Sequence, residues 1–109
     1  MTKTNPEEIN EAAVEIAAIA KAMSHPARCA ILNILSKHKY YYAMDIVAEL
    51  PLSQSTVSQH LKELKDAGLI KGVPDGTRVK YSLRQKAIIK AEKRFRKFFK
   101  KLDGQDSNE

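Results

Sequence analysis

The sequence predicts a mainly α-helical fold with one small β-hairpin. Apolar residues recur at helical spacing in five segments of the 109-residue chain. Before the last of these segments, two short runs with alternating apolar residues flank an Asp-Gly pair, which is a strong hairpin signal. A chain that is 43% apolar can support one modest core. We therefore expect a single domain over residues 1–109, with an ordered core over about 6–102 and a mobile tail over 103–109.

The first two helices are predicted from their start signals. Asn5 can cap the first helix, with Pro6 at its first position. Ser24 can cap the second helix, which carries Pro26 in its first turn. Apolar residues then follow at helical spacing: Ile9, Ala13, Ile16, Ala20 and Met23 in the first segment, and Ala27, Ile31, Ile34 and Leu35 in the second.

The next two helices are joined by a tight turn. The third is expected from about Ala43 to Leu50, because the residue before Pro51 avoids the helical region. The fourth begins after Ser53 and ends at Gly68, where a positive φ costs little. Two such helices in sequence form the arrangement of a helix-turn-helix.

A hairpin and a long helix complete the pattern. Leu69–Pro74 and Thr77–Leu83 are the expected strands, and Asp75-Gly76 is the expected two-residue turn. In the second strand apolar residues alternate with basic or polar ones, so one face of the strand is apolar and the other basic. The last helix spans roughly Gln85 to Leu102. A helix-turn-helix followed by a hairpin is a winged helix-turn-helix.

Positive charge is concentrated in the second half of the chain. Residues 1–60 carry 5 Lys and Arg against 6 Asp and Glu, whereas residues 61–109 carry 14 against 7. A basic region suits a polyanion such as double-stranded DNA, because each neutralised phosphate releases condensed counterions. A basic surface that only keeps the protein soluble is the alternative interpretation.

The sequence carries no membrane or secretion signal. No segment contains the roughly 20 apolar residues that a membrane span needs, and the start of the chain has no signal-peptide pattern. With one cysteine, Cys29, the chain cannot form an internal disulfide. We expect a cytoplasmic protein with no membrane partner.

The outer face of the fourth helix is a candidate surface for reading DNA bases. With Val57 at the centre of the buried face, a helical wheel places Ser55, Gln59 and Lys62 on the opposite side, with Ser58 on the flank. Gln pairs bidentately with adenine, and Ser and Thr bond several base edges or phosphates. The alternative is an ordinary solvated face whose Ser, Thr and Gln residues cap the helix.

The hairpin adds cations beside this helix. Thr77, Arg78 and Lys80 lie at or next to the predicted turn. Cations on a projecting turn can bind phosphate or enter a minor groove. A solvated hairpin with no DNA contact is the alternative.

Three segments resemble ArsR-type repressors. Residues 23–28, followed by Ile31, Leu32 and Leu35, resemble their second helix. Residues 52–64, followed by 67–70, resemble their recognition helix and its exit, and residues 75–83 are similar to their wing. The resemblance covers roughly residues 9 to 102, and the fourth-helix segment is its most specific part. It implies a dimeric, DNA-binding transcriptional regulator, a repressor by analogy.

The resemblance and the helical wheel together give the predicted DNA-binding residues. The family's DNA-contacting positions correspond to Gln54, Ser55, Ser58, Gln59 and His60. His60 lies about 60° from the buried centre of the fourth helix, so we interpret it as partly buried, packed against the third helix or in contact with a phosphate. The full predicted set is Gln54, Ser55, Thr56, Ser58, Gln59, His60 and Lys62 on the helix, with Thr77, Arg78 and Lys80 on the wing.

No metal or cofactor is predicted. Many ArsR-type proteins sense metals through paired cysteines at the start of the third helix, where this sequence has Tyr42 and Met44. A phenol and a thioether are poor ligands for soft metals. A second family site uses His and carboxylates on the last helix, which here has no His and only Glu92. The sequence identifies no effector.

Two other features are chemically interesting. Cys29 lies about 160° from Ile31 on the second helix, so it could be less buried than its neighbours, and Arg28 could favour its thiolate. A small packing residue is the preferred interpretation, because a redox switch would need a thiol from a second subunit. The run Tyr40-Tyr41-Tyr42 could line a pocket, but we expect it to close the core between two helices.

The first and last helices are predicted to form a dimer interface. Basic residues surround an apolar stripe on the last helix, and a chain this small has little core left to cover it. The alternative is that the stripe folds back on its own domain. The predicted interface residues are Ile9, Ile16, Ile19, Ile88, Phe95, Phe98, Phe99 and Leu102.

These features predict a sequence-specific DNA-binding regulator that binds a palindromic operator as a homodimer. A winged-helix module for protein binding, or a non-specific nucleoid-type DNA-binding protein, is the rival interpretation. An enzyme is not expected, because the sequence has no paired carboxylates, nucleophile–base set, phosphate loop or metal cluster.

Overall fold

The computed structural model describes residues 10–104 and has the predicted fold class. Over these residues, helices flank a two-stranded antiparallel hairpin, and α5 has the predicted bounds. The elements in order are α1 (Glu11–Ala22), α2 (Pro26–Leu35), α3 (Ala43–Glu49), α4 (Gln54–Asp66), β1 (Ile70–Asp75), β2 (Arg78–Leu83) and α5 (Gln85–Leu102). Residues 6–9 of the expected ordered core and residues 105–109 of the expected mobile tail lie outside the described residues.

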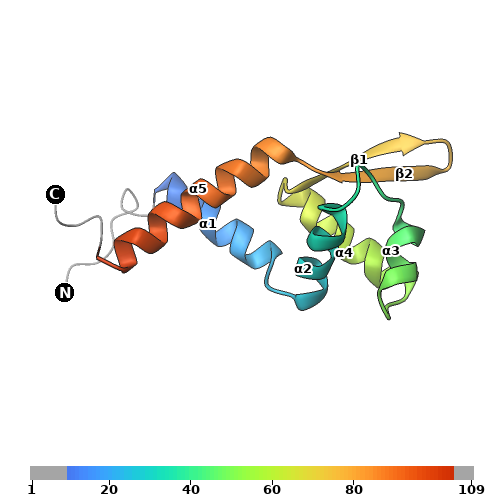
Figure 1. Cartoon of the computed structure of the whole chain (residues 1–109), viewed down its shortest axis with the longest axis horizontal. Coiled ribbons are helices and arrows are strands. Elements are labelled where there is room, and N and C mark those ends of the chain that lie inside the picture. The colour runs from blue at the N-terminus through green and yellow to red at the C-terminus, as the bar shows by residue number, and fades with distance from the viewer. Residues whose placement is uncertain (1–9, 105–109) are drawn as a thin grey trace.

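The molecule has two parts, which we call the body and the arm. The body consists of α2, α3, α4 and the hairpin, gathered at one end of the molecule (Figure 1). The arm consists of α1 and α5, which run side by side away from the body (Figure 1). The described chain is accordingly elongated, with extents of 53 × 26 × 25 Å.

The core of the body lies between its three helices and the roots of the strands. The predicted stripe of Val57, Leu61 and Leu64 is buried, with at most 1% exposed. It packs in one cluster with buried residues of α2, of α3 and of the chain that enters β1: Ile31, Ile34, Leu35, Ile46, Leu69 and Ile70. Burial of this stripe turns the opposite face of α4 toward solvent, which is the arrangement that a recognition helix needs.

The helices α1 and α2 begin at caps other than those expected. Asn10 caps α1 with its side-chain oxygen, which accepts from the Ala13 N–H at 3.0 Å. The expected cap and first residue of this helix, Asn5 and Pro6, lie outside the described residues. The cap of α2 is His25 and not Ser24. The Nδ1 atom of His25 accepts from the Ala27 N–H at 3.2 Å, and Pro26 takes the first helical position.

The turn between α3 and α4, and the end of α4, have the backbone conformations predicted from Pro51, Ser53 and Gly68. Leu50 is extended, with φ −124° and ψ 144°, as the residue before a proline should be. Ser53 caps α4, and its Oγ accepts from the Thr56 N–H at 3.2 Å. Gly68 follows the end of α4 with φ +81°, which glycine adopts without steric cost.

The hairpin turn lies one residue later than expected. Asp75 pairs with Arg78, so the loop residues are Gly76 and Thr77. The positive φ falls on Gly76 alone, at +64°, because glycine is the residue that tolerates it. Tyr41, in the α2–α3 loop, forms a further antiparallel bridge with Tyr81 of β2, which ties that loop to the edge of the hairpin.

Candidate nucleic-acid interface

The outer face of α4 is polar and exposed, as predicted. Burial of Val57 on the opposite side turns this face to solvent, and its residues are Gln54, Ser55, Ser58, Gln59 and Lys62. Gln59 donates from Nε2 to Glu63 at 3.3 Å, and the Lys62 ammonium pairs with Asp66 at 2.8 Å. The first two turns therefore present uncharged hydrogen-bonding groups. The carboxylates of this helix, Glu63 and Asp66, lie further along it.

Thr56 belongs to the helix cap. It is half-buried, and its Oγ1 accepts from the Ser53 hydroxyl at 2.9 Å. Its backbone N–H is the donor that the same hydroxyl satisfies. Thr56 is therefore placed to fix the start of α4 beneath the exposed Ser55.

His60 lies inside the body rather than on the predicted DNA-contacting face. It is only 6% exposed, and its polar contacts are with α2, whereas the sequence suggested α3. The Arg28 Nε–H donates to His60 Nδ1 at 3.1 Å, and the rings of His60 and His25 lie 4.5 Å apart. Burial first, then the neighbouring His25 and Arg28, lowers the pKa of His60, so the neutral ring that accepts from Arg28 is favoured. A helical wheel predicts how far such a residue is buried, but it does not identify the residues that it contacts.

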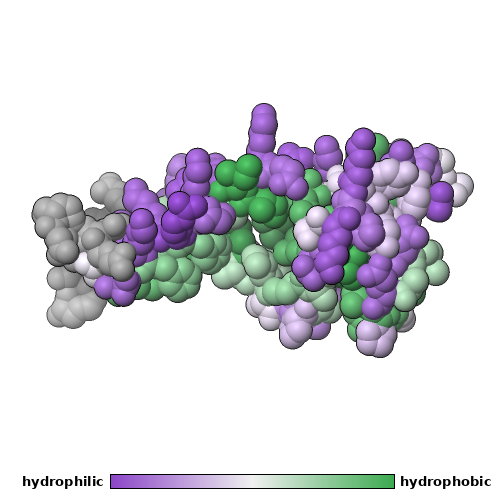
Figure 2. Space-filling view, in the orientation of Figure 1, coloured by the Kyte–Doolittle hydropathy of each residue, from purple (hydrophilic) through white to green (hydrophobic). Residues whose placement is uncertain are grey.

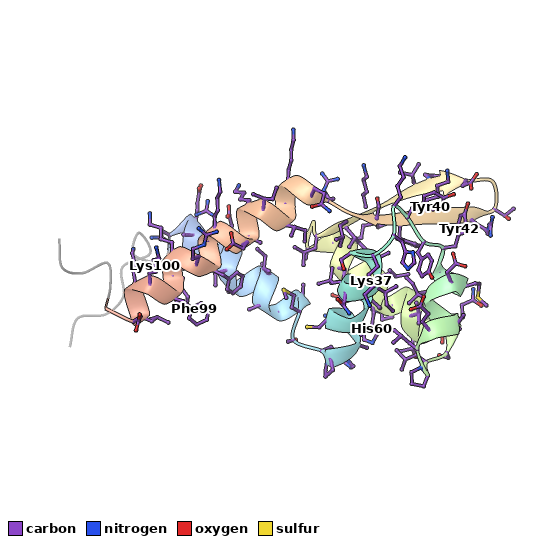
Figure 3. The ribbon with its side chains drawn as sticks, in the orientation of Figure 1. Lys37, Tyr40, Tyr42, His60, Phe99 and Lys100 are labelled. Carbon is purple, nitrogen blue, oxygen red and sulfur yellow. The ribbon has the colours of Figure 1, made fainter. Side chains whose placement is uncertain are left out.

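The wing carries its two cations over tyrosine rings. The Arg78 guanidinium lies 3.6 Å from the centre of the Tyr42 ring, and the Lys80 ammonium lies 4.6 Å from that of Tyr40. Both tyrosines come from the α2–α3 loop and lie beside the hairpin (Figure 3). Cation–π contacts of this kind hold a charged group in place without neutralising it.

The structure brings the start of α4 and the wing to one recess. Gln54, from the first position of α4, lines it together with Thr77 and Arg78 from the wing. The recess has a volume of about 190 Å³, and Tyr42 lies in its wall. Residues that the sequence assigned to two separate elements thus form one continuous surface.

The tyrosine run does not close the core between two helices as a unit. Tyr41 alone packs against the core cluster, and its hydroxyl donates to Glu49 at 2.6 Å. Tyr42 donates to Asp75, 33 residues along the chain, at 2.5 Å. That bond raises the pKa of Tyr42 to about 12 and lowers the pKa of Asp75. The sequence did not predict this contact between Tyr42 and Asp75, because no local pattern signals it.

Comparison with known proteins identifies the family. The model of the family described as "Bacterial regulatory protein, arsR family" matches residues 25–71. The transcriptional regulator YgaV from Escherichia coli is 38% identical over 81 residues, which are 74% of this chain and 82% of that protein. The transcriptional repressor PagR from Bacillus anthracis is 40% identical over 67 residues, which are 62% of this chain and 67% of PagR.

The chain belongs to the ArsR family of bacterial regulatory proteins. It is a DNA-binding transcriptional regulator with a winged helix-turn-helix, and it is not an enzyme. The fold is also that of a homodimeric winged helix-turn-helix DNA-binding domain from Mycobacterium bovis, at a TM-score of 0.64 and 24% identity, over 76% of this chain and 75% of that one.

The arm of this ArsR-family chain exposes apolar side chains. Ion pairs of Glu15 with Arg94 and Lys90 connect α1 to α5, and a groove of about 610 Å³ runs between the two helices. Hydrophobic side chains line one side of the arm, and hydrophilic ones the other (Figure 2). The exposed large apolar residues of the arm are Val14, Ile89, Phe98, Phe99 and Leu102. Val14 and Ile89 are not among the interface residues predicted from the sequence.

The other predicted interface residues divide between the arm and the body. Ile19 and Ile88 pack against the core cluster, and Ala91 is buried, so the first half of α5 does fold back on its own domain. Ile16 lines the groove between the arm helices, and Phe95 stacks with Phe99 at 6.4 Å. Ile9 lies outside the described residues.

Cys29 is exposed and not the packing residue that the sequence favoured. Its thiol donates to the Met23 carbonyl at 3.2 Å.

Among residues 10–104, no three His, Cys, Asp or Glu side chains are grouped as a metal ion would require. In the same part of the chain, no helix combines the length and hydropathy of a membrane span.

Proposed function

We propose that this ArsR-family regulator acts as a homodimer that binds a two-fold symmetric operator and represses transcription there. Each protomer inserts α4 into a major groove and rests its wing on the adjacent backbone. The observation that carries this proposal is the shared surface of α4 and wing, on which Gln54, Thr77 and Arg78 line one recess. Because DNA binding takes place where the genome is, we propose a cytoplasmic location.

The exposed groups on α4 divide naturally into base-reading and backbone-binding groups. Ser55 and Gln59 lie in the first two turns, away from the buried stripe, and read base edges. Gln54 and Ser58 flank them. Lys62, one turn further along, binds a phosphate once it leaves Asp66, since an exposed ion pair of this type is weak. His60 takes no base contact in this proposal, because it is buried against α2.

The wing supplies contacts that carry no sequence information. Thr77, Arg78 and Lys80 are at or near the tip, and neither cation forms an ion pair within 4 Å among the described residues. An unpaired guanidinium and ammonium can each release counterions from one phosphate. The wing therefore adds affinity, and α4 adds discrimination between sequences.

The dimer is proposed from the arm. Phe99 and Leu102 are 58% and 64% exposed, and with Phe98 they form an apolar end that a lone protomer leaves in water. A two-fold pairing of arms covers this surface on both protomers at once. The similar domain from Mycobacterium bovis is itself described as homodimeric, which supports the same assembly here.

Selection from random duplexes at near-physiological salt tests the proposal. A dimer with two recognition helices selects inverted half-sites about one helical turn, or ~34 Å, apart. Enrichment of a single half-site would contradict the dimeric mode of binding. Affinity for DNA without any enriched sequence would favour the nucleoid-type alternative, and no affinity at all would favour a protein-binding module.

A further inference from the structure

The tip of the wing contains a carboxylate directly opposite its most exposed cation. Asp75 and Arg78 are cross-strand partners at the end of the hairpin. Opposite charges at such positions normally attract one another and pair. Here they form no ion pair within 4 Å. The pKa of Asp75 is lowered first by the hydrogen bond from Tyr42, and then by the charges of Lys80 and Arg78.

Tyr42 contacts both charged groups. Its hydroxyl donates to Asp75 Oδ2 at 2.5 Å, while its ring lies under the Arg78 guanidinium at 3.6 Å. One side chain thus satisfies the carboxylate and supports the cation. The backbone of Tyr42 is fixed at the start of α3, where its N–H donates to Asp45 Oδ2 at 2.9 Å. The wing tip is therefore held by the helix-turn-helix itself, across 33 residues of sequence.

We propose that Tyr42 is a positioning residue for DNA binding, which keeps Arg78 available to a phosphate by occupying Asp75. The inference rests on the proposed role of the wing in DNA binding. Without the hydroxyl, Asp75 turns to its cross-strand partner and neutralises it. The protein then presents one phosphate-binding cation fewer on each protomer, although no residue that touches DNA has changed.

A double-mutant cycle tests this. Tyr42→Phe keeps the ring under Arg78 and removes the hydrogen bond to Asp75. We expect it to lower affinity for duplex DNA by about tenfold, as for loss of a charged hydrogen bond, and to flatten the slope of log affinity against log salt by about one unit per lost contact. In the Asp75→Asn background the same substitution should leave affinity within about twofold, because no carboxylate remains to capture Arg78.

The control is a tyrosine–carboxylate bond of the same kind one residue away. Tyr41→Phe removes the bond to Glu49, which lies on α3, and should leave both affinity and salt slope unchanged. Melting curves of all variants check that the body is folded. If Tyr42→Phe does not fold, O-methyltyrosine at position 42 replaces it, because it keeps the ring under Arg78 and removes the hydroxyl donor. An equal loss of affinity in the Asp75 and Asp75→Asn backgrounds would assign Tyr42 a purely structural role and overturn the proposal.

Arg78→Ala separates failure of this inference from failure of the proposed function. A loss of affinity for Arg78→Ala, with none for Tyr42→Phe, overturns the role of Tyr42 and leaves the wing contact intact. Unchanged affinity and salt slope for Arg78→Ala remove Arg78 from the interface, and the role of Tyr42 with it. The inference is supported if Arg78→Ala and Tyr42→Phe lose affinity equally. In the Asp75→Asn background, the loss should then disappear for Tyr42→Phe and persist for Arg78→Ala.

Discussion

The body and the arm differ in how much of their apolar surface they bury within one protomer. In the body, Ile31, Ile46, Val57 and Leu64 are fully buried, although the three helices that supply them have at most 13 residues each. In the arm, the 18-residue α5 is the longest helix described, yet its last turns leave Phe99 and Leu102 more than half exposed. Helix length therefore does not predict burial in this chain, because burial requires neighbours on several sides.

This difference shows which part of the molecule is complete in one protomer. The body has a closed core and polar contacts between its elements, including Arg28 with His60 and Tyr42 with Asp75. The arm has two helices joined by ion pairs of Glu15, and a groove between them. Substitutions that remove apolar groups from the two parts should consequently act in different ways.

The largest effect on folding is expected in the body. Leu64→Ala should lower the free energy of unfolding by about 2–5 kcal/mol, because Leu64 has no exposed surface and its loss leaves a cavity. Urea unfolding at several protein concentrations measures the loss, which should not depend on concentration. The matched arm variant is Leu102→Ala, whose loss should appear only at concentrations where dimers form. A concentration-independent loss of the same size for Leu102→Ala would show that the arm packs as the body does.

A charged end of the arm should abolish assembly without unfolding the body. Phe99→Glu with Leu102→Glu places carboxylates on the proposed interface, so sedimentation should show a monomer at micromolar concentration. Affinity for a two-half-site operator should fall on the order of a hundredfold, because the second half-site no longer binds within the same complex. Lys100→Glu changes charge in the same turn without removing apolar surface, and it should remain dimeric. Wild-type protein that is monomeric and still binds the operator tightly would contradict the role of the arm.

The base-reading face should respond to substitution in a sequence-dependent way. Gln59→Ala is expected to weaken binding to the selected operator by about 1–3 kcal/mol while hardly changing affinity for random DNA, since a bidentate base contact is lost. Lys62→Ala, on the same face one turn later, should weaken binding to both equally. Fluorescence anisotropy with the two duplexes gives both numbers. Equal losses on both duplexes for Gln59→Ala would remove it from base reading.

The smallest expected effect is that of pH on the stability of the body, through the buried His60. Burial lowers the pKa of His60 below its ordinary value of 6.5, so the folded state binds this proton less readily than the unfolded state. The stability that the neutral ring contributes is therefore complete above pH 6.5 and is lost as the pH falls through the folded-state pKa. Protonation of Nδ1 also removes the acceptor for Arg28.

Melting temperatures between pH 7.5 and 5 measure this effect. His60→Gln should reduce the dependence of stability on pH, whereas His38→Gln, at an exposed site in the α2–α3 loop, serves as the control and should retain it. Identical pH profiles for wild type and His60→Gln would show that the Arg28–His60 contact does not respond to protonation.

The sequence by itself determined the elements and the faces of the helices. The stripe of Val57, Leu61 and Leu64 has a spacing that only a helix can bring to one side, so the exposed face of α4 followed from it. Pro51 and Gly68 act through their own backbones, and the turns they mark were correctly predicted. The excess of basic residues in the second half indicated a polyanion before any contact was known.

Tertiary structure decided which side chains meet. His60 accepts a hydrogen bond from Arg28 on α2, 32 residues away in sequence. Tyr42 donates one to Asp75 on the wing, 33 residues away. The same holds for α5, whose apolar stripe is continuous in sequence but is buried at Ala91 and exposed at Leu102. Periodicity reports the angle of a residue around its own helix, whereas a partner depends on how separate elements pack, and that information is not local.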